Sequence, residues 1–191
     1  MPKYKTSKKE VLQKVIPILR ERGVSKSSMS ELAKACDIQK SHFYYYFNNK
    51  EKLIQSVLAE VNSYFQYKFS NIIGTENHTL TIVQKLEMIK DLINTLFRNA
   101  NSGCIMANTA LETAHLDTIY KIEIKSFFDN FITGLQILLD PYYSKKKALI
   151  LAEQIVQDLE GGILLMRIYN DHKYLNNAIY RMERVVLKQH L

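Results

Sequence analysis

The chain has 191 residues, 47% of them hydrophobic, with six glycines, three prolines and a net charge of +7. This composition excludes a disordered chain and is typical of a mostly helical globular protein of one or two domains. The sequence contains neither an apolar run of the roughly 18 to 20 residues that a membrane span needs nor a signal-peptide pattern, so we expect a cytoplasmic protein without a membrane partner.

The excess positive charge lies at the N-terminal end of the chain. Residues 1–52 hold 12 Lys and Arg against 5 Asp and Glu, a net charge of +7, whereas residues 53–191 hold 14 of each. A basic segment joined to a neutral body is typical of a protein that binds a polyanion. A solvated basic surface would have the same charge, so the motifs have to separate the two interpretations.

Helical spacing of apolar residues predicts an all-α chain of about nine helices and no strand. Gly23 is suited to end the first helix, and Pro17 inside that helix is expected to kink it. Ser28 and Glu31 have the spacing of a capping box that begins the second helix. The expected helices cover about Ser7–Arg22, Met29–Cys36, Lys40–Phe47, Lys50–Phe69, Thr81–Asn99, Gly103–His115, Asp117–Leu139, Ser144–Tyr169 and Lys173–Gln189.

The second and third predicted helices are short and are separated by a turn at Asp37-Ile38. Two such helices after a supporting first helix indicate a helix-turn-helix unit, whose last helix enters the major groove of DNA. Tyr44, Tyr45 and Tyr46 cannot all enter one core, because successive helix positions are about 100° apart. Some of their hydroxyls must therefore face outward, where they can donate to phosphates.

Other side chains of this region also suit DNA binding, whereas Phe43 and Phe47 are expected in the core. Lys40 can donate to guanine, and Gln39 can pair with adenine. Lys50 begins the fourth helix, where a cation and backbone N–H groups together can hold a phosphate.

Residues 8–55 resemble the N-terminal signature of the TetR family of bacterial repressors. The matching residues are Val11-Leu12, Gly23, Ser28, Glu31-Leu32-Ala33, Ile38, Phe43-Tyr44-Tyr45-Tyr46-Phe47 and Lys50-Glu51-Lys52-Leu53. The resemblance implies a helix-turn-helix DNA-binding domain over residues 1–52 and a helical ligand-binding and dimerisation domain over residues 53–191. It also implies repression that ends when an unknown small-molecule effector binds.

By position, the resemblance implies which residues contact double-stranded DNA. Ser28, Lys40, Tyr44, Tyr45 and Lys50 match residues that usually contact phosphates or bases. Gln39, Ser41 and His42 fall where the base-reading residues vary between members. Two residues depart from the family pattern, since Asp37 replaces the usual turn glycine and Ser41 replaces a frequent glycine.

The last two helices are expected to pair with their copies in a homodimer, which would present two DNA-binding units to a near-palindromic operator. Gly161-Gly162 would allow close helix approach. Packing within one chain is the alternative explanation for up to half of the apolar positions involved. These positions are Ile155, Leu159, Ile163, Leu164, Met166, Ile179, Tyr180, Met182 and Val186.

The segment from Gly103 to Glu112 resembles a glycine-cysteine segment in one branch of TetR-like regulators. Cys104, Asn108, Glu112 and His115 follow at steps of four, four and three, along one helical face. Polar groups on a mainly buried helix need partners. A ligand pocket formed with aromatic walls is one interpretation. Its expected residues are Phe97, Cys104, Asn108, Glu112, Phe127 and Phe131, with Phe128 beside them.

Three alternatives remain open for this helical face. Asn108 and Glu112 would instead cap or bridge neighbouring helices. Cys104 would sense oxidants or electrophiles if its thiolate were favoured. A metal site of Cys104, Glu112 and His115 is the weakest alternative, because its spacing is not diagnostic.

The five histidines are scattered, and no nucleophile–base pair or phosphate loop can be read. The sequence therefore predicts neither an enzyme nor a cofactor or metal. A protein-interaction adaptor with a related fold is the second hypothesis, but such a module would not need the basic N-terminal segment.

Overall fold

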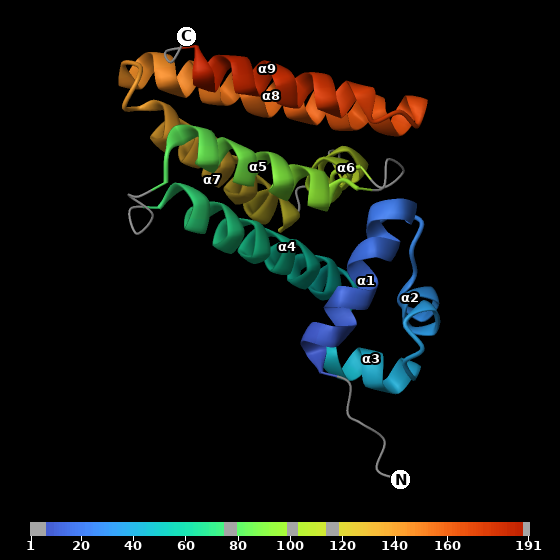
Figure 1. Cartoon of the computed structure of the whole chain (residues 1–191). Helices are drawn as coiled ribbons and strands as arrows, with labels where there is room; N and C mark the ends of the chain where they lie inside the picture. Colours follow the sequence, from blue (N-terminus) through green and yellow to red (C-terminus); the bar gives the residue numbers. More distant parts are fainter. Residues whose placement is uncertain (1–6, 75–79, 99–102, 114–118, 189–191) are drawn as a thin grey trace. The chain divides into compact units, whose positions relative to one another are not determined.

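The computed structural model describes residues 7–74, 80–98, 103–113 and 119–188. Within these ranges the chain forms nine α-helices and no strand (Figure 1), which confirms the expected all-α fold. The helices are α1 (Lys8–Arg22), α2 (Met29–Ala35), α3 (Lys40–Tyr46), α4 (Lys50–Ile73), α5 (Ile82–Leu96), α6 (Ile105–Thr113), α7 (Tyr120–Leu139), α8 (Lys145–Tyr169) and α9 (Lys173–Leu187).

The observed helix ends differ from the expected ones by a few residues. α4 continues past Phe69 to Ile73, because the buried Ile72 extends the apolar stripe that carries Phe65 and Phe69. α1 runs through Pro17 to Arg22 as one helix. The expected end of α6 at His115 and the expected start of α7 at Asp117 lie outside the described residues.

The chain divides into two compact units. Unit 1 consists of Met1–Asn62 and Ile105–Ile124, and unit 2 of Ser63–Cys104 and Lys125–Leu191. α4 and α7 therefore contribute to both units. The expected domain boundary after residue 52 lies inside α4, and α6 belongs to unit 1.

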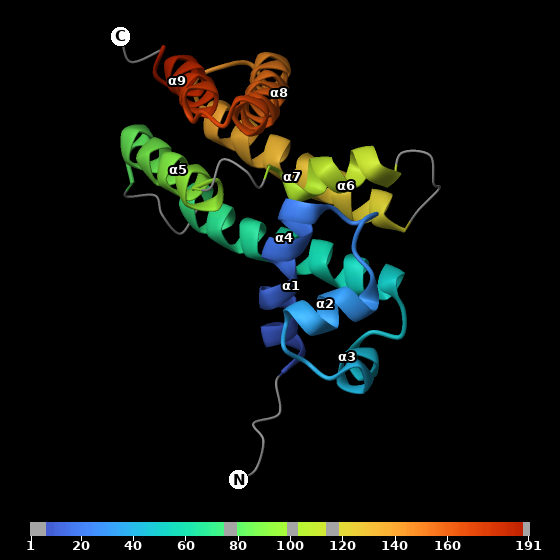
Figure 2. The same cartoon turned by 90° about the vertical axis from the view of Figure 1, so that its right-hand side faces the viewer.

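Local signals and a shared core determine the first part of unit 1, where α2 and α3 follow α1 as two short helices (Figure 2). Ser28 and Glu31 form the expected capping box at the start of α2. Ser7 and Glu10 form another at the start of α1. Phe43 is completely buried, and Phe47 is 1% exposed, as expected for core residues. Other buried side chains of this region are Val11, Leu12, Val15, Leu19, Leu32, Ile38 and Leu53.

In unit 2, α8 and α9 lie side by side along their lengths (Figures 1 and 2). Gly162 permits their close approach, because a Cβ atom there would lie 3.0 Å from both the Ala178 Cβ and the Tyr174 carbonyl oxygen. Most apolar positions predicted to form the dimer interface are buried within the protomer, so the alternative of packing within one chain holds for them. These residues are Ile155, Leu159, Ile163, Met166, Ile179, Met182 and Val186.

Aromatic residues join α4 to α7 within unit 2. The ring centroid of Phe65 lies 4.9 Å from those of Phe127 and Phe131, and the Phe69 ring packs edge-on against Phe131 at 5.2 Å. In the described ranges, no helix is both long and apolar enough to span a membrane.

Candidate functional site

The turn between α2 and α3 depends on Asp37. Its φ of +54° is left-handed, a conformation that glycine adopts without strain and that Asp adopts more readily than most residues. The backbone N–H of Asp37 donates to the Lys34 carbonyl, and that of Ile38 donates to the Ala33 carbonyl. Asp37 thus forms the tight turn that its position predicted, in place of glycine.

α3 presents most of its side chains to solvent. Phe43 is the only residue of α3 that is buried, and the predicted base readers Gln39 and Ser41 are exposed. The Gln39 side chain makes no capping hydrogen bond, although it occupies the N-cap position of α3. The N-terminal half of α3 therefore displays polar groups that are free to meet base edges.

The tyrosines of α3 differ in exposure, as the helical spacing requires. Tyr45 is 78% exposed and Tyr44 is 40% exposed, whereas Tyr46 is half-buried. The Tyr46 ring lies 5.3 Å from that of Tyr45 and 5.0 Å from that of His42. These ring contacts restrict the rotamers of Tyr45 and His42, which are both predicted to contact DNA.

Two cations accompany this surface. The Lys40 ammonium lies 5.9 Å from the centroid of the Tyr44 ring, within range of a cation–π interaction. At the start of α4, the Asn49 side-chain oxygen accepts the N–H of Lys52 at 2.8 Å. Lys50 is half-buried there, and its ammonium donates to the Ser25 carbonyl oxygen at 3.4 Å.

Ser28, a predicted phosphate contact, is held by its role as helix cap. Its hydroxyl accepts the N–H of Glu31 at 3.2 Å, and the Glu31 carboxylate accepts the N–H of Ser28 at 2.8 Å. Hydrogen bonds from the Ser28 side chain and backbone lower the pKa of Glu31. The Ser28 hydroxyl is exposed, so a phosphate acceptor would compete with the Glu31 carboxylate for its proton.

The residues predicted to bind a ligand are divided between the two units. Phe127 and Phe131 lie together in unit 2, with ring centroids 6.5 Å apart. Phe97 is the half-buried C-cap of α5, and Cys104 is buried in the same unit. Asn108 and Glu112 belong to unit 1. A groove of about 500 Å³ also runs between α4 and α7 in unit 2, with Phe65, Phe69, Asn130 and Thr133 among its lining residues.

Cys104 has a partner that its sequence position does not predict. The thiol of Cys104 hydrogen-bonds to the carboxyl group of Glu160 on α8, and burial raises the pKa of that carboxyl to about 7 despite this hydrogen bond. The sequence held a signal for Glu160, since it lies between Val156 and Ile163 at helical spacing, on the buried side of α8. A glutamate on an apolar stripe needs a partner.

The Glu112 carboxylate accepts a hydrogen bond from a backbone group. Its carboxylate oxygen Oε2 accepts the N–H of Ser25 at 2.6 Å, in the connection between α1 and α2. His115, the last residue of the predicted polar face, lies outside the described residues. Among the described residues, no group of three or more His, Cys, Asp or Glu could hold a metal ion.

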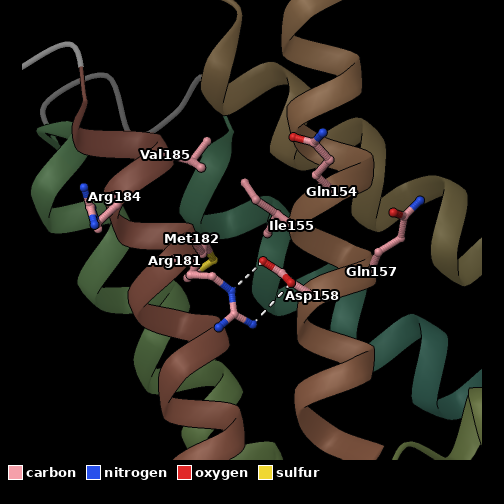
Figure 3. A pocket seen from close by; sticks show the side chains of 8 residues that line it. All are labelled: Gln154, Ile155, Gln157, Asp158, Arg181, Met182, Arg184 and Val185. Carbon is pink, nitrogen blue, oxygen red and sulfur yellow. Dashed lines mark hydrogen bonds and ion pairs between the residues drawn. The ribbon is translucent and has the colours of Figure 1, made fainter.

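The outer surface of α8 carries a regular exposed stripe, at steps of four, three, four, three and four. Its ends are apolar, with Ile150 38% exposed at one end and Leu164 51% and Ile168 63% exposed at the other, and its middle contains an exposed glycine. Beside the stripe, residues of α8 and α9 line a groove of about 540 Å³, where Arg181 Nε donates to Asp158 Oδ2 at 2.9 Å (Figure 3). The stripe residues are Ile150, Gln154, Gln157, Gly161, Leu164 and Ile168.

Comparison with known proteins places this chain in a family. Residues 18–57 match the family described as bacterial regulatory proteins, tetR family, and residues 83–180 match the LmrA/YxaF-like transcriptional regulator C-terminal domain. The chain is 24% identical over 179 residues to the HTH-type transcriptional repressor DhaR of Mycobacterium sp. (strain GP1), covering 90% of this chain and 88% of that protein.

Solved structures agree over nearly the whole chain. A TetR transcriptional regulator from Legionella pneumophila superimposes with a TM-score of 0.85 at 26% identity, covering 97% of this chain and 99% of that one. Regulatory protein TetR from Rhodobacter sphaeroides has the same fold, with a TM-score of 0.79 at 18% identity and coverages of 91% and 95%. The chain is therefore a member of the TetR family of bacterial transcriptional regulators, with an LmrA/YxaF-like C-terminal domain.

Proposed function

We propose that this regulator is a homodimeric repressor that binds a near-palindromic operator and leaves it when a small molecule binds. The exposed surface of α3 carries the proposal, because a polar and aromatic helix face is joined to a segment with a net charge of +7. That combination provides both base-reading groups and the positive charge that phosphates attract. The relative DhaR is itself named a transcriptional repressor.

The DNA contacts divide into two classes. Lys40, Tyr44, Tyr45, Lys50 and Ser28 position the protein on the phosphate backbone, because each has a donor on an exposed or half-exposed side chain. The second class reads base edges from the N-terminal half of α3. Its members are Gln39, Ser41 and His42.

Dimerisation is proposed through the exposed stripe of α8 together with α9. Residues at alternating steps of three and four form one seam of a helix, as in coiled coils, and an isolated protomer leaves this seam uncovered. Tyr180 on α9 is also 58% exposed. A twofold arrangement then places one DNA-binding unit on each half of a palindromic site.

The effector is proposed to bind through unit 2, where buried aromatic rings surround few polar groups. Phe127 and Phe131 supply apolar surface, and Phe97 and Cys104 belong to the same unit. Such sites combine apolar walls with a small number of orienting polar groups. The other two residues predicted from the sequence, Asn108 and Glu112, belong to unit 1 and are not part of this proposed site. A regulator of chromosomal DNA acts in the bacterial cytoplasm, which is the location that we propose.

The decisive experiment measures DNA affinity by fluorescence anisotropy, using the intergenic DNA next to the protein's own gene and a random duplex of equal length. We expect tighter binding to the first duplex. The logarithm of the affinity should fall linearly with the logarithm of the salt concentration. Footprinting should reveal two protected half-sites about one helical turn apart, or a multiple of that spacing. Equal affinity for both duplexes at every salt concentration contradicts the proposal and favours an adaptor role.

A further inference from the structure

The connection between α1 and α2 is held by a carboxylate from a helix distant in sequence. Glu112 lies on α6, which packs against α1 within unit 1. Its Oε2 atom accepts the backbone N–H of Ser25 at 2.6 Å. A hydrogen bond to a charged acceptor is stronger than one between neutral groups. The pairing therefore joins α6 to the connection directly, through a backbone N–H that every residue except proline would supply at position 25.

Gly23 leaves the space that this carboxylate occupies. A Cβ atom at Gly23 would lie 2.9 Å from Glu112 Cδ and 3.0 Å from Oε2, and closer still to Oε1. Gly23 also has a φ of +82°, which disfavours any residue with a side chain. At position 23 the backbone conformation disfavours any side chain, and an added Cβ atom would also force the Glu112 carboxylate to shift.

The same connection is also held through the carbonyl group of Ser25. While Glu112 accepts the Ser25 N–H, the Lys50 ammonium at the start of α4 donates to the Ser25 carbonyl oxygen at 3.4 Å. The buried Ser27 hydroxyl donates to the Gly23 carbonyl oxygen at 2.8 Å and closes the turn. Ser28, the next residue, caps α2. Ser25 therefore accepts a hydrogen bond from one proposed phosphate contact, Lys50, and lies three residues before another, Ser28.

We propose that Glu112 is a positioning residue for DNA binding, which rests on the proposed function. Its carboxylate fixes residues 23–28 so that Ser28 and Lys50 are presented together to the phosphate backbone. Glu112 itself touches no DNA, since a carboxylate would be repelled by phosphates. This role replaces, for Glu112, the direct ligand contact that its helical position predicted.

Hydrogen exchange at the Ser25 amide tests the hydrogen bond without DNA. The wild-type amide should be protected, although Ser25 lies in an exposed connection. Glu112→Ala should accelerate its exchange about tenfold, whereas Glu112→Gln, which keeps an acceptor oxygen, should retain part of the protection. Glu123→Ala, in a half-exposed helical glutamate of the same unit, is the matched control and should leave the Ser25 amide unchanged.

A double-mutant cycle tests whether the carboxylate lies beside Gly23. Gly23→Ala should lower the free energy of unfolding, through both backbone strain and collision with Glu112. In a Glu112→Ala background the collision is removed, so the same substitution should cost measurably less. Equal costs in the two backgrounds, by urea denaturation, would overturn the proposed placement.

DNA binding then separates positioning from direct contact. Glu112→Ala should weaken affinity for the preferred duplex about three- to tenfold, with Glu112→Gln between it and wild type. The slope of log affinity against log salt should stay unchanged, because no phosphate contact is lost, whereas Lys50→Ala should reduce that slope by about one. If Glu112→Ala accelerates exchange of the Ser25 amide but leaves DNA affinity unchanged, the positioning role is overturned. A wild-type protein that lacks sequence preference, with a protected Ser25 amide, would contradict the proposed function alone.

Discussion

The Cys104 thiol and the Glu160 carboxyl group share a hydrogen bond inside unit 2, and burial raises the pKa of that carboxyl to about 7. The pair joins the residue immediately before α6 to the middle of α8. A buried acid that titrates near neutral pH makes the stability of unit 2 depend on pH over a range that is easily measured.

Glu160→Gln should remove this pH dependence. Below pH 4.5 the carboxyl is protonated in both folded and unfolded chains and contributes no difference. Between pH 4.5 and about 7 the unfolded chain releases a proton that the folded chain keeps, so stability falls as pH rises, by about 3 kcal/mol at most. Urea denaturation at pH 5 and pH 8 measures the loss. The control Glu153→Gln, at an exposed position on α8, should lose as much stability between pH 5 and pH 8 as the wild type. If Glu160→Gln also loses as much as the wild type, the Glu160 carboxyl is not the cause of the pH dependence.

Tyr45→Ala should weaken operator binding about tenfold, because its side chain is the most exposed tyrosine of α3 and its hydroxyl is proposed to donate to a phosphate. Tyr45→Phe, which removes only the hydroxyl, should account for most of that loss. Tyr67→Ala is the matched control, since Tyr67 is 64% exposed on α4 in unit 2. If anisotropy titrations give Tyr45→Ala and Tyr67→Ala the same operator affinity, Tyr45 does not contact the DNA.

Ile168→Glu should dissociate the proposed homodimer. The side chain is 63% exposed at the end of the α8 stripe, and a charge buried at a helix–helix seam is costly. Sedimentation equilibrium should show at least about a tenfold rise in the dimer dissociation constant. Ile122→Glu, at a 74% exposed position of α7, should leave the association unchanged. If the dimer tolerates Ile168→Glu but not Ile122→Glu, the interface does not lie on the α8 stripe.

Gly134→Ala should lower the free energy of unfolding by about 1–3 kcal/mol, because an added Cβ would lie 2.7 Å from Ile73 Cδ1 and 2.8 Å from Phe69 Cδ1. Phe69 is held by stacking on Phe65 and by its contact with Phe131, so its ring has little room to move. Thr133→Ala, at the exposed neighbouring position, should change stability by about 0.5 kcal/mol or less. Thermal denaturation of the two variants gives the comparison, and similar midpoints would show that α4 and α7 can separate at Gly134.

The sequence predicted the helices and the DNA-binding unit because their signals are local. Capping at Ser28, the left-handed turn at Asp37 and the burial of Phe43 each depend on residues within a few positions of one another. The concentration of positive charge in residues 1–52 is likewise a property of the chain itself. Function at the level of a DNA-binding regulator therefore followed from the first quarter of the sequence.

Only the tertiary structure decided what the apolar and polar faces of the later helices contact. Periodicity identifies an apolar stripe on α8 but not its partner, so it cannot separate a dimer interface from packing within one chain for Ile155 and Leu159, and the structure buries both within the protomer. In the same way, Glu112 has a helical position that suits a ligand pocket, yet its partner is a backbone N–H in the connection between α1 and α2. A helical repeat fixes which residues share a face, whereas the neighbour that covers the face depends on how distant segments pack.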